Sequence, residues 1–381
     1  MDFELSEEQR LLQDSLRRLL TGRYGFEQRR AHAASPEGWS REIWSAYAEL
    51  GILGLPFAEE DGGFGGGPVE TMIVMEALGG ALALEPYLTT VVLGGGFLRH
   101  GADAALRSDL VPRLAEGNLL LAFAQTEPQS RYDLGDVETK ARRDGDAWVI
   151  DGGKGVVLHG DSADRLIVTA RTAGGSRDRK GVGVFLVDAR AEGVSRHGYR
   201  TMDGGRAAEI QFSGVRAEAV LGDPEDGLPL VERVVDEAIA ALAAEAVGVM
   251  EAAHLLTLDY LKTRRQFGTA IGSFQALQHR AADMMVQLEQ TRSMAMYAAM
   301  MAMDEDAGER RRAMNAVKVQ VGRAARKLGQ ESIQLHGGIG MTMEYAIGHY
   351  FARLTAIDTL FGDAERHLRQ LSDAGGLVPA G

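Results

Sequence analysis

A glycine-rich turn near the end of the chain is the stretch of this sequence best suited to binding a large ligand. Residues 334–340 read QLHGGIG, and the adjacent Gly337 and Gly338 allow a backbone to come close to a bulky group. Earlier in the chain, residues 264–268 read RRQFG and supply a cation, Arg264. The glycine turn suggests a nucleotide cofactor.

The composition narrows the class of protein. With 381 residues, 45% hydrophobic and 25% charged, the chain is typical of a soluble globular protein of two or three domains. The absence of cysteine excludes disulfides, thiolate metal sites and a cysteine nucleophile, and we predict no metal site. A net charge of −13 argues against nucleic acid as a partner, because its phosphates would be repelled.

The N-terminus gives an expectation for localisation. The first ten residues, MDFELSEEQR, are acidic and lack the basic and apolar regions of a secretory signal. No run approaches the roughly 18 uncharged apolar residues that cross a membrane. We therefore expect a cytoplasmic protein that does not interact with membranes.

The first part of the chain is predicted to be helical. Residues 6–22, 39–50 and 69–84 place apolar side chains at helical spacing, and Ser6 is a plausible cap for the first helix. The glycine-rich turn 61–67 follows no strand-like run and lacks the Gly-Lys-Ser/Thr ending of a phosphate loop. We therefore interpret this turn as a plain connection.

The pattern changes near Leu119. Alternating runs such as 165–169 and 183–187, separated by turn residues, predict a compact antiparallel β segment at about 120–222. Because these strands do not alternate with long helices, a βαβ dinucleotide-binding fold is not expected. From Leu228 onward the pattern is helical again.

In this order of elements and in four local motifs, the chain closely resembles the acyl-CoA dehydrogenases, flavoenzymes that oxidise the Cα–Cβ bond of an acyl thioester. The motifs are 126–128 (TEP), 264–268 (RRQFG) followed by 274–275 (FQ), 334–340 (QLHGGIG), and the helical C-terminus. The resemblance covers nearly the whole chain.

The resemblance implies an α+β fold of three domains. These are an N-terminal helical domain at 1–118, a middle antiparallel β-barrel domain at 119–225, and a C-terminal four-helix-bundle domain at 226–381. In the family, the RxxFG and QxxGGxG segments reach across a subunit interface to hold the adenosine and pyrophosphate half of the neighbouring subunit's FAD. The matching positions here are Arg264, Phe267, Gln275, Gln334, Gly337 and Gly338.

The half of the site that would hold the flavin ring departs from the family pattern. Phe123, Gln125 and Thr126 match the strand that lies along the ring. The family's Trp-Ile-Ser/Thr, however, reads VVL here, with Val156 and Leu158 at the two positions that contact the ring. Leucine offers no hydroxyl hydrogen, and valine has no flat face to stack. The family's Gly-Ser-Asp after TEP likewise reads RYD, so only its aspartate remains.

The base for the reaction is also missing from its usual position. Dehydrogenation needs a carboxylate to take the α-proton while hydride leaves the β-carbon for the flavin. In most of the family this is a Glu-Gly pair, which falls here at Phe361-Gly362. In a second branch it is a Glu-Arg pair on the long helix, which falls here at Ala238-Ile239.

Three nearby carboxylates are alternatives for the base. Asp363 lies two residues beyond the usual position and is the catalytic candidate, unless it is solvated or contacts the flavin. Glu237 neighbours the second position but points about 100° away on a helix. Glu245 lies among alanines, where a buried carboxylate is more often part of a structural ion pair. His336, inside the glycine turn, is expected to pack or cap.

These losses fit the small, companion subunits of heteromeric acyl-CoA dehydrogenases. The stretches VVLHGDSAD and LTAIDTLFGDAERHL resemble the small subunit of pimeloyl-CoA dehydrogenase and the companion subunits of sterol-side-chain dehydrogenases. We therefore expect a subunit that supplies FAD contacts in trans to a homologous subunit, in a dimer of dimers. The resemblance also implies an acyl-CoA substrate, an electron-transfer flavoprotein as acceptor, and a role in fatty acid, dicarboxylic acid or sterol side-chain degradation.

Two alternatives remain. The chain would be a self-sufficient homotetrameric dehydrogenase if an unorthodox base such as Asp363 served it. It would be a flavin-free acyl-CoA-binding or structural paralogue if the cofactor segments had no ligand. The presence of both cofactor segments counts against the second alternative, because packing alone demands neither.

Overall fold

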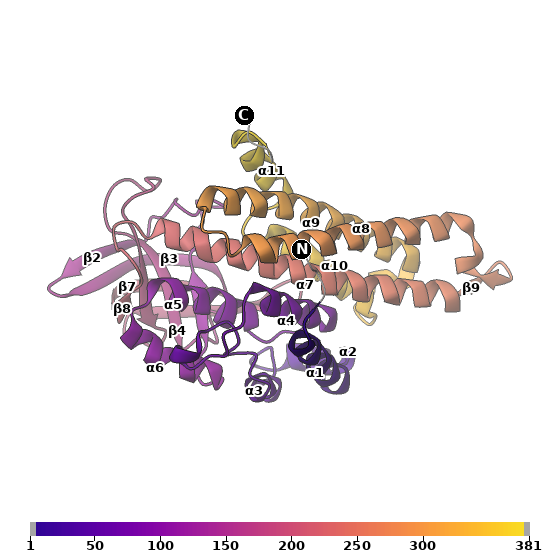
Figure 1. Ribbon diagram of the computed structural model, residues 1–381, viewed down its shortest axis with the longest axis horizontal. Helices are drawn as coiled ribbons and strands as arrows, with labels where there is room; N and C mark the ends of the chain where they lie inside the picture. The colour runs from indigo at the N-terminus through magenta and orange to yellow at the C-terminus, as the bar shows by residue number, and fades with distance from the viewer. Residues whose placement is uncertain (1–4, 377–381) are drawn as a thin grey trace. The chain divides into compact units, whose positions relative to one another are not determined.

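The computed structural model describes residues 5–376, and the first part of the chain is helical (Figure 1). Its elements are α1 (Glu7–Arg23), α2 (Phe26–Ala34), α3 (Arg41–Glu49), η1 (Glu59–Asp61), α4 (Pro68–Ala81), η2 (Leu88–Gly94), α5 (Gly95–Gly101) and α6 (Ala104–Ala115). Helix α1 begins where the sequence predicts. The Ser6 hydroxyl accepts from the Gln9 N–H and the Gln9 side chain accepts from the Ser6 N–H, which forms a capping box.

An eight-stranded sheet occupies the middle of the chain. Its strands are β1 (Leu121–Ala124), β2 (Lys140–Asp144), β3 (Ala147–Leu158), β4 (Arg165–Arg171), β5 (Val182–Asp188), β6 (Val194–Arg200), β7 (Arg206–Arg216) and β8 (Ala219–Val220). The hydrogen-bonded order is β6-β7-β3-β2-β4-β5-β8, with β1 beside β4. Most pairs are antiparallel as predicted, but β1 runs parallel to β4. A parallel pair needs a long connection, and the loop, β2 and β3 supply it.

The last part of the chain is helical again. Its elements are α7 (Leu228–Thr263), β9 (Arg265–Gln266), β10 (Thr269–Ala270), η3 (Ile271–Ser273), α8 (Gln275–Met301), α9 (Ala307–His336), η4 (Gly337–Met341), α10 (Ala346–Thr359) and α11 (Ala364–Asp373). Helix α9 is the centre of this group, since it packs against α8, α10 and α11. The β9–β10 hairpin connects α7 to α8 (Figure 1).

The chain packs as two compact units. The helical unit combines the residues before His32 with Pro68–Ala83 and the chain from Ile239 onward. The β-containing unit comprises His32–Gly67 and Leu84–Ala238. This division follows spatial contacts and not chain order, because α4 packs against α1 and α8, which lie far from it in the sequence. The three-domain boundaries remain a prediction.

In the part of the chain that the structure describes, α7 is long and apolar enough to cross a membrane. The mean hydropathy of its apolar window is 1.6, yet 78% of that window is buried inside the protein. This burial leaves little of the helix for lipid. We therefore interpret α7 as a core helix.

Candidate functional site

The β9–β10 hairpin presents the first cofactor segment. Phe267 and Gly268 have φ angles of +53° and +81°, which are typical of the type I′ turn of a two-residue hairpin. A left-handed phenylalanine is strained, and this one is 91% exposed. Arg264, at the start of the hairpin, is exposed as well. The exposed ring of Phe267 and the exposed guanidinium of Arg264 are therefore both accessible to a ligand.

The glycine turn presents the second cofactor segment. Helix α9 ends at His336, and Gly337 follows with φ +64° and ψ −139°, a conformation open only to glycine. A Cβ added to Gly337 or to Gly338 would meet no atom within 4 Å. Both glycines are exposed. The turn is thus an open backbone surface of the kind that a pyrophosphate can approach.

The other residues predicted for this half of the site lie on the helices beside these segments. Gln275 is the first residue of α8 and is exposed, and Gln334 is exposed in the last turn of α9. His336 is buried, with its Nδ1 2.8 Å from the Ser332 carbonyl, and its ring stacks on Tyr260 at 4.6 Å. His336 therefore packs, as expected.

The residues predicted for the ring half come together in the β-containing unit. Phe123 is buried in β1 against Phe97, with ring centroids 4.7 Å apart. Beyond the end of β1, the Thr126 carbonyl accepts from the Gly155 N–H at 2.8 Å. This hydrogen bond brings the exit of β1 to the part of β3 that carries Val156.

A bulge in β3 sets the direction of Val156. The pairing of β3 with β7 shifts register between Lys154 and Val157, and Val156 has a φ of +51°. Its side chain is 52% exposed, whereas Leu158 is half-buried and pairs with Ala207. The two apolar side chains offer neither an aromatic ring nor a hydroxyl, as the sequence predicts.

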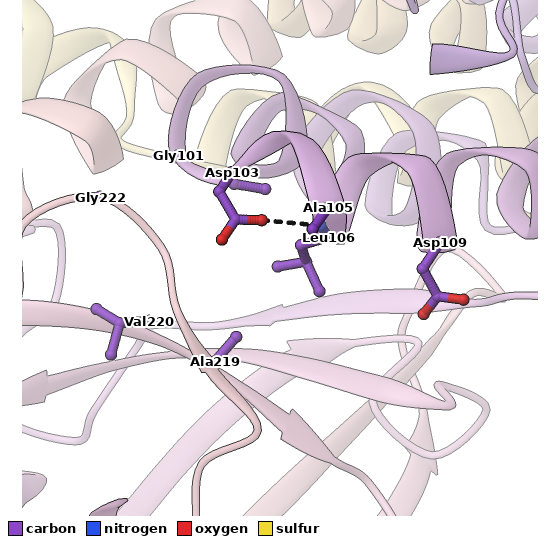
Figure 2. A pocket seen from close by; sticks show the side chains of 9 residues that line it. Gly101, Asp103, Ala105, Leu106, Asp109, Ala219, Val220 and Gly222 are labelled. Atoms are coloured by element: carbon purple, nitrogen blue, oxygen red, sulfur yellow. Dashed lines mark hydrogen bonds between the residues drawn. The ribbon is translucent and has the colours of Figure 1, made fainter. Parts of the chain in front are cut away.

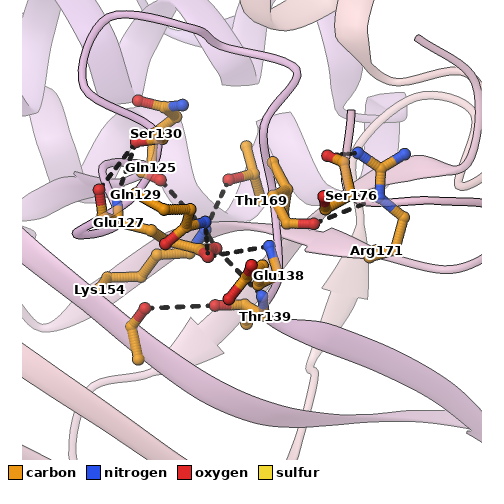
Figure 3. Close-up of polar contacts among 12 residues, drawn as sticks. Gln125, Glu127, Gln129, Ser130, Glu138, Thr139, Lys154, Thr169, Arg171 and Ser176 are labelled. Carbon is orange, nitrogen blue, oxygen red and sulfur yellow. Dashed lines mark hydrogen bonds and ion pairs between the residues drawn. The ribbon is translucent and has the colours of Figure 1, made fainter. Parts of the chain in front are cut away.

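Sequence analysis missed the polar network behind these residues. Lys154 and Glu127 form a buried ion pair with Nζ and Oε1 2.7 Å apart (Figure 3). The Gln125 side chain is also buried, and its Nε2 has no hydrogen-bond partner among residues 5–376, although the Gln125 backbone carbonyl accepts from Lys154. A lysine within the predicted β segment, two residues before Val156, was the available signal.

The usual position of the base lies in a fixed turn between α10 and α11. Phe361 has a φ of +58°, and its carbonyl accepts from His367 Nε2 at 3.1 Å. Burial, reinforced by the Lys318 charge, lowers the pKa of His367 to about 3 and keeps its ring neutral. Lys318 Nζ donates to the carbonyls of Ile357, Asp358 and Leu360 at 2.8–3.0 Å and caps α10.

Asp363 serves as the N-cap of α11. Its Oδ1 accepts from the Arg366 N–H at 2.8 Å, and its backbone carbonyl accepts from the His367 N–H. A cap carboxylate is already committed to orphan N–H groups at the start of its helix. The geometry thus gives Asp363 a structural role.

Glu237 is held by two arginines and a histidine in the β-containing unit. Its carboxylate accepts from Arg99 at 2.7 Å, His100 at 2.7 Å and Arg233 at 3.2 Å. Burial alone would raise the pKa of Glu237, but the His100 hydrogen bond and the Arg99 charge lower it to about 2. This carboxylate is therefore a poor base.

The depressed pKa of Glu237 predicts an acid-dependent loss of stability. A carboxyl whose folded pKa is depressed contributes stability above its unfolded pKa of 4.5 and loses it as the pH falls through 2. We expect its share of this loss to be on the order of 3 kcal/mol between these pH values. Glu237→Gln should remove that share, which urea denaturation at a series of pH values measures. An unchanged slope in the variant would contradict the assignment.

Glu245 forms the structural ion pair that its apolar surroundings predict. Arg353 contacts both carboxylate oxygens within the helical unit, Nε at 2.5 Å and the second nitrogen at 2.8 Å. The Glu245 side chain is 8% exposed. Both oxygens of this carboxylate are therefore engaged in a structural contact with one arginine.

A groove elsewhere in the β-containing unit contains none of the predicted site residues. Its volume is about 750 Å³, and it lies between the α5–α6 junction and β8 (Figure 2). Small apolar side chains such as Ala105, Leu106 and Val220 line it, together with Asp103 and Asp109. Asp103 caps α6 by accepting from the Leu106 N–H at 2.8 Å.

Comparisons with known proteins agree with this architecture. The chain matches the acyl-CoA dehydrogenase N-terminal domain over residues 6–118, the middle domain over 122–215 and the C-terminal domain over 225–375. It is 32% identical to a probable acyl-CoA dehydrogenase, YngJ, of Bacillus subtilis, across 91% of this chain and 92% of that protein.

Two solved structures are also similar to this chain. One is a variant of the Tcur3481–Tcur3483 steroid ACAD, with a TM-score of 0.87 and 30% identity over 96% of this chain and 97% of that one. The other is the ChsE4–ChsE5 complex from Mycobacterium tuberculosis, with a TM-score of 0.88 and 25% identity over the full length of both chains.

Three successive domain matches on this fold define a flavin-dependent oxidoreductase that acts on acyl-CoA. The chain belongs to the acyl-CoA dehydrogenase family, and its cofactor is FAD. The open turn at Gly337 and the exposed Arg264 fit the pyrophosphate half of that cofactor. At the ring half, Val156 and Leu158 supply no stacking ring and no hydroxyl.

Proposed function

We propose that this chain is the companion subunit of a heteromeric FAD-dependent acyl-CoA dehydrogenase. Arg264, Phe267, Gln275, Gln334, Gly337 and Gly338 hold the adenosine and pyrophosphate half of a flavin whose reacting ring faces a homologous subunit. When bound, FAD would supply the hydride acceptor for oxidation of the acyl thioester, and the homologous subunit would supply the base. The assembly is a dimer of dimers in the cytoplasm that passes electrons to an electron-transfer flavoprotein.

This proposal rests on the observation that each candidate carboxylate already makes a structural contact. Phe361 stands at the usual base position, and Asp363 caps α11. Glu237 and Glu245 are each held by arginine. The glycine turn is open to a cofactor, whereas the candidate carboxylates are engaged in a helix cap or in ion pairs. The chain is therefore better suited to binding a cofactor than to removing a proton.

The likeness to a steroid ACAD and to a two-protein complex supports a partner subunit and a bulky acyl group. We propose the CoA thioester of a sterol side chain as the substrate class. Short fatty acyl-CoA and dicarboxyl-CoA esters are the comparison substrates.

The proposal is tested by purifying the chain alone and together with a homologous acyl-CoA dehydrogenase subunit, then measuring bound flavin and acyl-CoA oxidation. We expect the complex to be yellow and active, and the lone chain to be inactive. A yellow lone chain that oxidises acyl-CoA would favour a self-sufficient enzyme. A chain that stays colourless in the complex would favour a flavin-free paralogue.

Two substitutions of Asp363 separate a capping role from a catalytic one. Asparagine caps helices as well as aspartate does, so Asp363→Asn should leave both stability and turnover of the complex nearly unchanged. Asp363→Ala should cost about 1 kcal/mol of stability, because the cap is lost. Thermal unfolding and acyl-CoA oxidation are measured for both. Loss of turnover in the asparagine variant at wild-type stability would identify Asp363 as the base.

A further inference from the structure

The buried pair of Lys154 and Glu127 is fully hydrogen-bonded. The Lys154 side chain is 0% exposed, and its Nζ donates to the Gln125 carbonyl at 3.1 Å, Glu127 Oε1 at 2.7 Å and Thr169 Oγ1 at 3.0 Å. An ammonium group has three donors, so each of them is used. Figure 3 shows these three contacts converging on the lysine.

Glu127 closes the base of the loop that follows β1. Its carboxylate accepts from the backbone N–H groups of Glu138 at 2.8 Å and Thr139 at 3.1 Å, and from the Gln129 side chain at 2.8 Å. One carboxylate therefore ties the beginning of this loop to its end, just before β2. The loop contains the RYD residues that replace the family's Gly-Ser-Asp.

The pair lies directly behind the residues assigned to the ring half. Lys154 holds the backbone of Gln125, and its neighbour Gly155 holds the Thr126 carbonyl. Val156, with its left-handed φ, follows immediately. The contacts of Lys154 and Gly155 thus fix the exit of β1 against the bulge of β3, while Thr169 fixes both to β4.

Net stability does not explain such a pair. Removing two charges from water costs several kcal/mol per ion, and an apolar pair of the same size often gives equal or greater stability. What apolar side chains cannot do is hold three backbone groups, the Gln125 carbonyl and the Glu138 and Thr139 N–H groups, at hydrogen-bond distance. The distinctive effect of the pair is therefore geometric.

We propose that the Lys154–Glu127 pair is the positioning element of the ring half of the flavin site. The pair fixes the position of the backbone at the end of β1 and at the bulge of β3. The chain therefore forms this half of the site with main-chain groups, since Val156 and Leu158 contribute no polar or aromatic contact. This inference rests on the proposed function for its link to flavin, but its structural part stands independently. Lys154 and Glu127 are positioning residues and act through the segments they hold.

The test replaces both members at once, Lys154→Met with Glu127→Leu, in the complex with the homologous subunit and flavin. We expect a melting temperature close to wild type, since no charge is left buried alone. Exchange of the Glu138 and Thr139 amide hydrogens should become at least tenfold faster. The dissociation constant for flavin should rise at least tenfold, and the absorbance spectrum of the remaining bound flavin should shift.

Controls separate this effect from loss of charge or of fold. The exposed pair Arg216–Asp144, at 3.0 Å in the same unit, is replaced by Met and Leu and should leave exchange at 138–139 and flavin binding unchanged. If the buried double variant does not fold, Glu127→Gln keeps the shape of the side chain and is measured in the same way.

Wild-type exchange at Glu138 and Thr139 together with a wild-type flavin spectrum, in a folded variant of the buried pair, would overturn the inference. Faster exchange with unchanged flavin affinity and spectrum would overturn its link to the ring site. A complex that binds no flavin even with the wild-type chain overturns the proposed function instead, while amide exchange still reports what the pair positions.

Discussion

Replacing Gly248 with alanine is expected to destabilise the helical unit by roughly 3 kcal/mol, the upper end of the usual cost of overpacking. Gly248 lies in α7 where this helix crosses α4. A Cβ built there would lie 1.9 Å from the Glu76 carbonyl oxygen and 2.8 Å from the Gly80 nitrogen. Both atoms belong to the backbone, so no side-chain rotation relieves the clash and the two helices must separate.

Gly80→Ala is the matched control for this contact. A Cβ at Gly80 would lie 3.7 Å from the Gly248 carbonyl oxygen, an ordinary van der Waals distance. Alanine also favours a helix by up to about 1 kcal/mol over glycine, so this variant should be as stable as wild type or more so. Urea denaturation and thermal unfolding compare the two variants. Equal stability of Gly248→Ala and wild type would show that α4 and α7 can move apart at little cost.

The close approach of α4 and α7 also bears on the role of Glu245. A Cβ at Gly79 would lie 2.2 Å from the Glu245 carbonyl oxygen, so the backbone of α7 is held against α4 at this point as well. The Glu245 side chain is meanwhile held by Arg353 from α10. Three helices of the helical unit thus meet at Glu245, which explains why a carboxylate is buried among alanines.

Local patterns predicted much of the fold. Ser6 ahead of apolar residues at helical spacing predicts a helix start because its hydroxyl can accept from an N–H group of the first turn, and α1 begins there. The alternating run 165–169 predicts a strand because its apolar side chains recur along an extended backbone, and β4 contains it. These signals act over a few residues and need no knowledge of the rest of the chain.

Contacts between distant segments were not predictable in this way. Lys154 and Glu127 are 27 positions apart and share no periodicity, so only the folded sheet reveals their pairing. Glu245 was expected to have a partner, but Arg353 lies 108 positions away. The capping role of Asp363 was within reach, since an aspartate before a helical run is a known start signal. Because Asp363 lies two residues beyond the usual base position, it was interpreted as a catalytic candidate instead.

Of the two cofactor segments, the conformation of the glycine turn was predictable from local sequence and the hairpin was not. Gly337-Gly338 indicated a close backbone approach because glycine adopts conformations closed to other residues. The structure gives Gly337 such a conformation, with φ +64° and ψ −139°. The hairpin that presents Phe267 was not predicted, because its strands have only two residues each and carry no measurable alternation.

Gly337→Ala is expected to weaken flavin binding in the complex by on the order of 100-fold, because the added methyl group blocks the close approach of the ligand to the turn, a loss of about 3 kcal/mol. The alanine methyl would enter the open space beside the turn, where no protein atom lies within 4 Å. It would thus meet the ligand and not the protein. Flavin dissociation constants, measured with the purified complex, give the effect.

The control for Gly337→Ala is Gly145→Ala in the turn between β2 and β3. Gly145 has a φ of +63°, close to the +64° of Gly337, and a Cβ there also meets nothing within 4 Å. Both substitutions place a side chain at a positive φ, and we expect each to cost up to about 2 kcal/mol of stability. Only the change at Gly337 should release flavin. If both variants bind flavin as tightly as wild type, the glycine turn does not hold the cofactor, and the proposed contribution in trans loses its main contact.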